Sequence, residues 1–277
     1  MVYSCCLFTF NTVQPQANCA MKISFSLCLI WFVCVSGTAQ TVTELFRLKS
    51  RHATQAVAVD SLHFYAISNS QIVKYRKSTK DSVATWKGPL KHLNSGVVLN
   101  GKLYCTNSSY PEKPMASSVE IFDTKTLQHI GSQSFGIYEG SCTWVDWYQG
   151  HWYAYFSQYE NEGGEPGRGV QYSSLVQFDS EWRRTAGWML PQTLVERIRP
   201  MNLSGGTFRE DGLLYCSPHH DLELYILRIP TISYVLEWVK TIPVPFQGQG
   251  FAIDRYQKNV LYGMHRGTRE VIAIKLE

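Results

Sequence analysis

Clustered basic charge is the first feature that the sequence lacks. The chain carries 26 Lys and Arg against 22 Asp and Glu, a formal net charge of +4, and no run of basic residues is longer than two. Binding to a nucleic-acid backbone requires Lys and Arg side chains gathered on one face. We therefore predict that nucleic acid is not a partner of this protein.

The short motifs of several catalytic and metal sites are also missing. There is no Cys-x-x-Cys, His-x-x-His, Gly-x-Ser-x-Gly elbow or phosphate-binding P-loop. Carboxylates are scarce near the site predicted below, where only Glu139 and Asp146 occur, which argues against a glycosidase pair and a tight calcium site. We predict no cofactor, and a divalent metal held by histidines is the alternative.

One apolar run resembles a membrane segment but is too short for a comfortable span. It covers residues 23–35, follows a short basic region, and ends at the small residues 36–39, which suit cleavage after Ala39. This pattern is typical of a secretory signal peptide. We interpret residues 1–20 as a spurious upstream extension and 21–39 as the signal peptide. The mature protein is then periplasmic or secreted, with no membrane contact after cleavage.

The mature part is poor in cysteine and rich in aromatic residues. Only Cys105, Cys142 and Cys216 follow residue 39, and such a low, odd count does not make a disulfide framework. The chain holds 16 Tyr and 8 Trp, and aromatic residues favour half-buried strands. With 277 residues, the chain suits one large all-β domain.

Internal repetition gives the architecture. Five segments share an apolar strand, a tight turn, a strand with an aromatic residue near its end, and a third alternating strand. They open at His52 (HATQAVAVD), His92 (HLNSGVVLN), Gly140 (GSCTWVDW), Met201 (MNLSGGTF) and Gly248 (GQGFAIDR). The openings are 40, 48, 61 and 47 residues apart, and four-stranded propeller blades run at about 40–50 residues. We therefore predict a five-bladed β-propeller over residues 40–277, with helix limited to a turn or two at Pro191–Ile198.

The last blade lacks its fourth strand. Third strands are expected at residues 71–75, 118–122, 174–178, 223–227 and 270–274, and the chain ends three residues after the last of them. Residues 43–48 form a strand-like segment before the first blade, with no partner of their own. Pairing this segment with the last blade closes the ring and leaves only short edges.

Propeller topology predicts a site without any motif. The first strand of each blade lines the central channel and the second strand returns antiparallel, so the start of the first and the end of the second lie at one end of the ring. Both positions are polar in every blade. We predict His92 and His219 as catalytic residues. The predicted substrate-binding residues at this channel mouth are His52, Gln55, Asn94, Asn107, Glu139, Gln158, Asn202, Ser204, Gln249 and Arg266.

Two long insertions fall at the same end, between the second and third strands of two blades. They cover residues 108–117, with Tyr110, and 159–172, with Glu160, Glu162 and four glycines. Long loops on a rigid scaffold often carry function, and the second loop is a candidate lid. His219 and His220 are adjacent, so at most one of them faces the axis if the segment is extended.

Whole phrases of the chain resemble one family. Four segments resemble a group of bacterial five-bladed propeller proteins commonly labelled "cycloisomerase". They are HLNSGVVLNGKLYCTNSSYPEKPMASSVEIFDTKTLQHIGSQSFGIYEGSCTWVD, SLVQFDSEWRR, SGGTFREDGLLYCSPHHDLELY and GQGFAIDR. The resemblance covers nearly all of residues 50–275. It implies that His52, Gln55, His92, Asn94, Asn202, His219 and Gln249 lie at the channel mouth. Asn107 and Gln158 depart from the family, because histidine is expected there.

A more distant resemblance is to the plant-type glutaminyl cyclases, which are also five-bladed. Residues 54–57 (Thr-Gln-Ala-Val) are similar to their Thr-Gln-Gly-Leu. Their second blade carries an acidic residue where this chain has Asn94-Ser95-Gly96, which argues against the cyclase activity here.

Two function classes follow from these patterns. The first is a monomeric enzyme that acts on a small polar molecule by acid/base isomerisation or lactone chemistry, with a histidine as proton carrier and Arg266 favouring a carboxylate. The second is a non-catalytic propeller that binds a glycan or a protein. Exposed Trp and Tyr on the long loops would favour the second.

Overall fold

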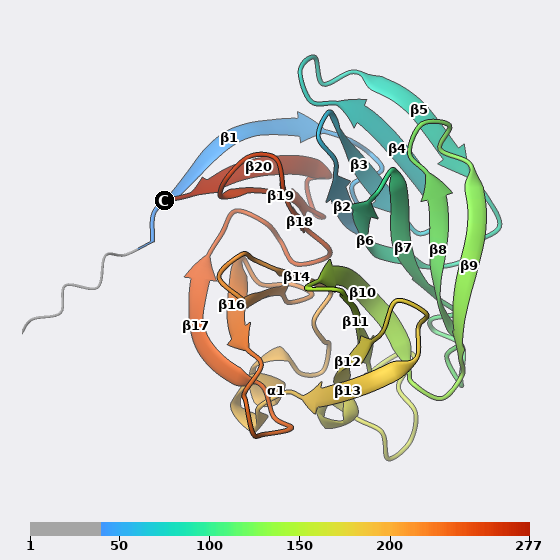
Figure 1. Ribbon diagram of the computed structural model, residues 1–277, viewed down its shortest axis with the longest axis vertical. Coiled ribbons are helices and arrows are strands. Elements are labelled where there is room, and N and C mark those ends of the chain that lie inside the picture. The colour runs from blue at the N-terminus through green and yellow to red at the C-terminus, as the bar shows by residue number, and fades with distance from the viewer. Residues whose placement is uncertain (1–39) are drawn as a thin grey trace, which may run out of the picture. The chain divides into compact units, whose positions relative to one another are not determined.

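A computed structural model describes residues 40–277 of the chain, and the predicted upstream extension and signal peptide lie outside this part. The described residues form five four-stranded antiparallel sheets arranged around a common centre as a five-bladed β-propeller (Figure 1). The predicted fold is therefore confirmed.

Each of the first four blades consists of four consecutive strands. Blade one holds β2 (Ala56–Val59), β3 (His63–Ser68), β4 (Gln71–Arg76) and β5 (Ser82–Lys87). Blade two holds β6 (Leu93–Leu99), β7 (Lys102–Ser108), β8 (Ser117–Asp123) and β9 (His129–Gly136). Blade three holds β10 (Ser141–Tyr148), β11 (His151–Ser157), β12 (Ser174–Phe178) and β13 (Arg184–Met189). Blade four holds β14 (Gly205–Phe208), β15 (Leu214–Ser217), β16 (Glu223–Arg228) and β17 (Glu237–Pro243).

Blade five joins the two ends of the described chain. It contains β18 (Ala252–Ile253), β19 (Val260–His265) and β20 (Glu270–Leu276), and its outer strand is β1 (Val42–Lys49). The register runs from Val42 opposite Leu276 to Lys49 opposite Glu270, which confirms the predicted closure. Two short helices complete the described part, η1 (Val170–Tyr172) and α1 (Gln192–Ile198), and neither could cross a membrane.

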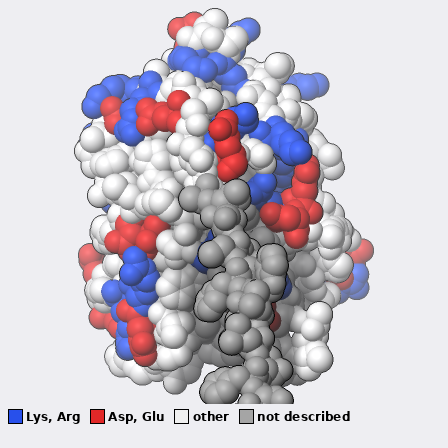
Figure 2. Space-filling view, turned by 90° about the vertical axis from the view of Figure 1, so that its left-hand side faces the viewer, with Lys and Arg blue, Asp and Glu red and all other residues white. Residues whose placement is uncertain are grey.

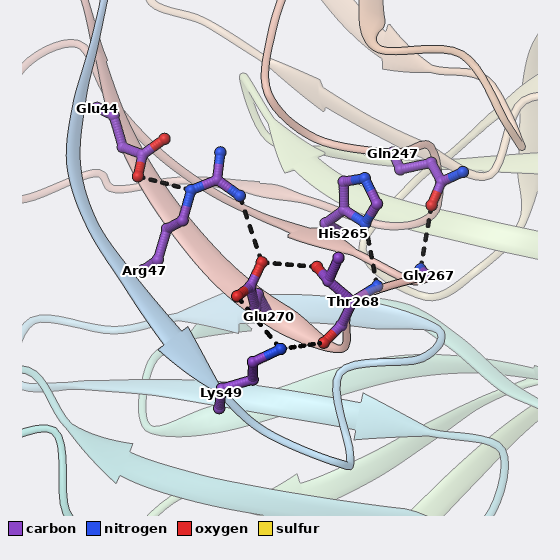
Figure 3. A network of polar contacts seen from close by, with 8 residues as sticks. All are labelled: Glu44, Arg47, Lys49, Gln247, His265, Gly267, Thr268 and Glu270. Atoms are coloured by element: carbon purple, nitrogen blue, oxygen red, sulfur yellow. Dashed lines mark hydrogen bonds and ion pairs between the residues drawn. The ribbon is translucent and has the colours of Figure 1, made fainter.

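Side chains reinforce the pairing of β1 with β20. Glu270 accepts a hydrogen bond from the Thr268 hydroxyl at 2.6 Å and forms ion pairs with Arg47 at 3.3 Å and Lys49 at 3.5 Å (Figure 3). Arg47 also pairs with Glu44 at 2.7 Å. On the side of the molecule drawn in Figure 2, charges of both signs likewise lie next to each other. The closing strand therefore has specific polar contacts in addition to its backbone hydrogen bonds.

The core is divided into five apolar clusters, one at each junction between neighbouring blades. At the junction of blades three and four, the rings of Trp144 and Tyr155 stack at 5.6 Å, and Gly206 leaves room for the indole. Aromatic residues with large apolar surfaces fill these wedges well. Because every blade packs on two neighbours, the inner strands are held in fixed positions around the axis.

Two of the tight turns contain pairs of residues with positive φ. Asn100 and Gly101 both have positive φ, 49° and 75°, and Gln149 and Gly150 repeat this at 47° and 82°. Two central residues with positive φ are required in the hairpin turns that match strand twist. These turns set the register between the first and second strands of blades two and three.

Candidate functional site

A cavity of about 260 Å³ opens at the end of the channel where the inner strands begin. Its wall combines inner-strand starts, second-strand ends and the two long loops. The lining residues are Gln55, His92, Asn94, Tyr110, Thr143, Tyr159, Glu162, Met201, Ser204, His219, Gln249 and Arg266. The cavity lies at the end of the ring where the propeller topology predicts the site.

Each blade contributes one neutral hydrogen-bonding side chain to the cavity from the start of its inner strand or the residues just before it. All five are buried: Gln55 is 4% exposed, Asn94 4%, Thr143 3%, Ser204 7% and Gln249 2%. Gln249, three residues before β18, itself adopts a positive φ of 62°. The axial part of the site is therefore uncharged and rich in amide and hydroxyl groups.

Most of these groups already have protein partners. Gln55 donates from Nε2 to Asn69 Oδ1 at 2.5 Å, and Thr143 donates to the Leu203 carbonyl at 2.9 Å. The Asn94 amide nitrogen differs, because Nδ2 is buried and has no hydrogen-bond partner within residues 40–277. A buried donor without a partner costs free energy. The Asn94 amide is therefore available to a ligand in the cavity.

Both predicted catalytic histidines line the cavity, and both are held neutral at pH 7. Burial, and then the nearby Arg266 charge, lower the pKa of His92 to about 4. Burial, then His220 and Arg266, lower the pKa of His219 to about 3. Arg266 Nη1 donates toward His219 Nε2 at 3.4 Å, which requires that this nitrogen be unprotonated. Both imidazoles can therefore accept a proton.

The turn that carries Arg266 is fixed by its neighbours. Gly267 donates its backbone N–H to Gln247 Oε1 at 3.0 Å, and Thr268 donates to His265 Nδ1 at 3.2 Å (Figure 3). The guanidinium has five donors in a planar fork. Its contact with His219 leaves most of them free to bind an anion.

The prediction that at most one of His219 and His220 faces the axis assumed an extended segment, and the structure has a bend there. Their rings meet edge to face with centroids 4.1 Å apart. The alternation rule applies to extended strands, whereas these two residues lie in a bend between β15 and β16. His220 packs against His219 but does not line the cavity.

The two long loops cover the cavity together. Tyr110 packs against His92 with ring centroids 5.1 Å apart and against Tyr159 at 5.2 Å. Gly163 lies directly against the Tyr110 ring, where a Cβ would overlap it. Glu160 forms a two-pronged ion pair with Arg199, with an N–O distance of 2.7 Å, which ties the second loop to the segment after α1.

Five predicted substrate-binding residues do not line this cavity, and each of them has a hydrogen bond or an ion pair elsewhere. Asn202 is 1% exposed, accepts from Tyr155 and donates to the Gln158 carbonyl and the Ser173 hydroxyl. Asn107 accepts from the His92 backbone N–H and donates to Ser118.

The remaining members of this group lie outside the cavity for a similar reason. Gln158 donates to the Glu139 carbonyl at 2.9 Å, and the Glu139 carboxylate faces Arg184 at 3.3 Å. His52 accepts from Arg51 and lines a separate surface hollow beside Tyr75. These five residues therefore do not line the cavity, because a polar residue near a strand end can serve the fold alone.

Five lining residues were not among the predicted site residues: Tyr110, Thr143, Tyr159, Glu162 and Met201. A signal existed for three, because Tyr110, Tyr159 and Glu162 belong to the loops that were expected at this end. Met201 is the predicted opening of the fourth blade, whereas Thr143 had no comparable signal in the sequence.

The opposite end of the channel holds a smaller hollow of about 120 Å³. Its buried carboxylate, Asp146, accepts hydrogen bonds from the backbone of Phe208 at 2.8 Å and from Thr207 at 3.1 Å, and it pairs with Arg255. Asp146 therefore has a structural role between blades three and four, away from the larger cavity. Within residues 40–277, no three His, Cys, Asp or Glu side chains come together as a metal-binding group.

Comparison with known proteins concerns the fold. The chain is similar to the crystal structure of Myxococcus xanthus glutaminyl cyclase, with a TM-score of 0.56 and 10% identity, covering 86% of this chain and 97% of that one. It is also similar to the RRP9 WD40 repeats, with a TM-score of 0.48 and 12% identity, covering 80% and 79% of the two chains. No family model and no curated protein matches the sequence. At 10% identity the likeness to the first of these structures shows the β-propeller fold alone, and the resemblance to the "cycloisomerase" family stays a prediction.

Proposed function

We propose that the cavity binds a small polar molecule that carries a carboxylate, and that His92 and His219 act on it as bases in ring-forming, ring-opening or isomerisation chemistry. The cavity of about 260 Å³ lies just below the range of about 300–1,000 Å³ for drug-sized ligands, so it suits a metabolite. The expected signal peptide places this activity in the periplasm or outside the cell, in a monomer.

The observation that carries the proposal is the Asn94 amide nitrogen, which is buried in the cavity wall and has no hydrogen-bond partner among the residues that the structure describes. Arg266 stands on the same cavity with most of its donors free, and its guanidinium matches a carboxylate in a two-pronged arrangement. An amide donor at the axis and a fixed cation at the rim together select an elongated, oxygen-rich anion.

Neutral histidines fit this chemistry, because a general base must be unprotonated before it acts. Arg266 is one cause of the depressed pKa of both His92 and His219. A ligand carboxylate that pairs with Arg266 offsets its charge, and so raises the histidine pKa values toward the operating pH. Ligand binding would thereby make each imidazole a better proton acceptor.

Two resemblances favour ring chemistry within this class. The family phrases in the sequence belong to proteins labelled "cycloisomerase", and the structurally similar Myxococcus xanthus protein is a glutaminyl cyclase. Lactones, muconates and peptides with N-terminal glutamine are therefore the first substrates to screen.

The test combines binding and turnover. Purified protein is titrated by calorimetry with small carboxylic acids and with their neutral amides, and the substrate panel is followed by NMR. We expect acids to bind and amides to bind at least tenfold more weakly, with Arg266→Gln removing the preference. His92→Gln and His219→Gln should abolish turnover while retaining binding.

A matched control is Arg228→Gln, because Arg228 is exposed on β16 and pairs with Glu237 far from the cavity. It should bind acids as the wild type does. Equal binding of acids and amides to the wild type would overturn the proposal.

One observation favours the non-catalytic alternative. Tyr138 is 79% exposed and Tyr172 is 52% exposed, and Arg168 on the second loop donates to the Tyr138 carbonyl at 2.9 Å. Exposed tyrosines beside a loop can form a platform for a sugar ring or a protein. Glycan-array binding that is lost in Tyr138→Ala and Tyr172→Ala, but kept in His92→Gln, would support this alternative.

A further inference from the structure

Two side chains of opposite charge line the same cavity but do not form an ion pair with each other. Glu162 lies on the loop 159–172 and Arg266 on the turn after β19, and both line the cavity. Neither forms an ion pair with an acidic or basic side chain within the described residues 40–277, and Arg266 contacts the neutral His219. The cavity therefore presents an unpaired anion and an unpaired cation at different points of its wall.

The ring of Tyr110 lies near both charges. Burial raises the pKa of Tyr110, Glu162 raises it further, and Arg266 lowers it. Tyr110 also packs on His92, with ring centroids 5.1 Å apart, and Arg266 is one cause of the lowered pKa of both histidines. A ligand that fills the cavity therefore lies against a wall that carries both charges.

The surface on either side differs in charge. Beyond Arg266, a hollow of about 390 Å³ is lined by His219, His220 and a second arginine, Arg269. On the loop 159–172, the other two glutamates are ion-paired, Glu160 with Arg199 and Glu165 with Arg168. Glu162 is therefore the carboxylate of this loop without an ion-pair partner within residues 40–277.

We propose that the ligand is a zwitterion of the amino-acid class, whose carboxylate binds Arg266 and whose ammonium group binds Glu162. This inference rests on the proposed function for the carboxylate and adds the ammonium group. The rest of the ligand lies over the neutral amides and hydroxyls at the axis, where the Asn94 amide nitrogen donates to one of its oxygens. Neutral His92 and His219 do not repel the ammonium group, whereas two imidazolium ions would.

The test uses matched ligands. Each amino acid of a polar panel is paired with its des-amino acid, which keeps the carboxylate, and with its amide, which keeps the ammonium group. Affinities are measured by calorimetry for the wild type, Glu162→Gln and Arg266→Gln. Glu112→Gln is the control, because Glu112 is an exposed glutamate on the neighbouring loop that pairs with Lys91 and does not line the cavity.

We expect amino acids to bind the wild type at least tenfold more tightly than their des-amino partners. Glu162→Gln should remove this preference and leave des-amino binding within twofold, while Arg266→Gln should weaken both ligands. Glu112→Gln should match the wild type. Glu162 is exposed, so its replacement should leave the thermal midpoint unchanged.

The outcomes separate the two proposals. Carboxylates that bind with no preference for an ammonium group, or a Glu162→Gln variant that weakens both ligands equally, would overturn the zwitterion while leaving the proposed function in place. If no carboxylate binds at any affinity, both proposals fail together.

Discussion

The Nζ atom of Lys77 lies 2.5 Å from Oδ2 of Asp254, across 177 residues of sequence. Lys77 follows β4 in blade one, and Asp254 follows β18 in blade five. Their side chains are 9% and 0% exposed, and Nζ also lies 5.4 Å from the centre of the Tyr262 ring. This buried pair joins the first and last blades near the axis, whereas β1 joins them at the rim.

Breaking the Lys77–Asp254 pair should strongly destabilise the propeller. Lys77→Met leaves the Asp254 carboxylate buried without its countercharge, and such a loss costs about 3–5 kcal/mol. Replacing both residues, as Lys77→Met with Asp254→Leu, should cost less than Lys77→Met alone, because no uncompensated charge remains. Urea unfolding followed by tryptophan fluorescence measures the free energy of unfolding for each variant.

An exposed ion pair provides the comparison. Arg228 and Glu237 lie 3.1 Å apart with side chains 54% and 51% exposed, and exposed pairs contribute about 0–1 kcal/mol. If Lys77→Met costs no more than Arg228→Met, the buried pair does not stabilise the junction of blades one and five.

The closing strand should depend on one aromatic side chain. Phe46 on β1 packs against Phe64 at 5.9 Å and Tyr262 at 5.8 Å between ring centroids. Phe46→Ala should lower the free energy of unfolding by about 2–3 kcal/mol, somewhat less than a fully buried Phe→Ala change, because Phe46 is half-buried.

Leu45 provides a control on the same strand. It sits at the register break between Glu44 and Phe46 and is 46% exposed, so Leu45→Ala should change stability by less than about 1 kcal/mol. Equal losses in Leu45→Ala and Phe46→Ala would mean that strand pairing, and not the aromatic contact, holds β1 in place.

The architecture could be predicted from the sequence because the sequence pattern of the blades repeats. The five predicted blade openings lie one to four residues before the observed inner strands, and the predicted third strand at 174–178 coincides with β12. Closure by residues 43–48 followed from an unpaired strand at one end and a missing strand at the other. Both inferences use hydrogen-bonding requirements that every sheet must meet.

The site could be predicted only in part from the sequence, because the position of a residue along a strand does not determine where its side chain points. In β6 the register shifts between Leu93 and Gly96, and Asn94 within this irregular stretch lines the cavity. Asn107 lies on β7, one strand away from the axis, and its amide instead holds the His92 backbone. The Asn202 side chain accepts a hydrogen bond from Tyr155, and the periodicity of the sequence does not reveal this contact between residues 47 positions apart.

The depressed pKa of His92 should make the propeller less stable in mild acid. In the unfolded chain this histidine titrates near 6.5, whereas in the folded protein burial lowers its pKa to about 4. As the pH falls below 6.5, the unfolded state takes up a proton that the folded state refuses. Linkage then removes about 2 kcal/mol of stability between pH 7.5 and pH 5.

Replacing the histidine isolates its share of this effect. His92→Gln should lose about 2 kcal/mol less than the wild type over the same interval, because glutamine does not titrate. Urea unfolding at pH 7.5 and pH 5.0 measures both proteins, in which the remaining titratable groups are the same. An identical pH dependence in the two proteins would show that His92 titrates normally.

Gly248 should control the position of His219. It has a φ of 56°, and a Cβ at this position would overlap the carbonyl group of His219 and lie 2.7 Å from the Pro218 carbonyl oxygen. Gln249 in turn donates its backbone N–H to Pro218 at 3.1 Å. Gly248→Ala should therefore displace the segment that carries His219, and should shift the imidazole NMR signals of that residue.

A substitution at Gly150 distinguishes the effect of this clash from the effect of backbone strain. Its φ is 82°, and no atom outside its immediate neighbours lies within 4 Å of a Cβ built there, so Gly150→Ala introduces left-handed strain without a collision. That strain costs about 1–2 kcal/mol and should leave the His219 signals in place. Gly248→Ala should cost more and weaken carboxylate binding at least tenfold. If the two variants lose equal stability and the His219 signals do not move, the segment 218–220 tolerates displacement at Gly248, and the glycine is needed there only for its backbone conformation.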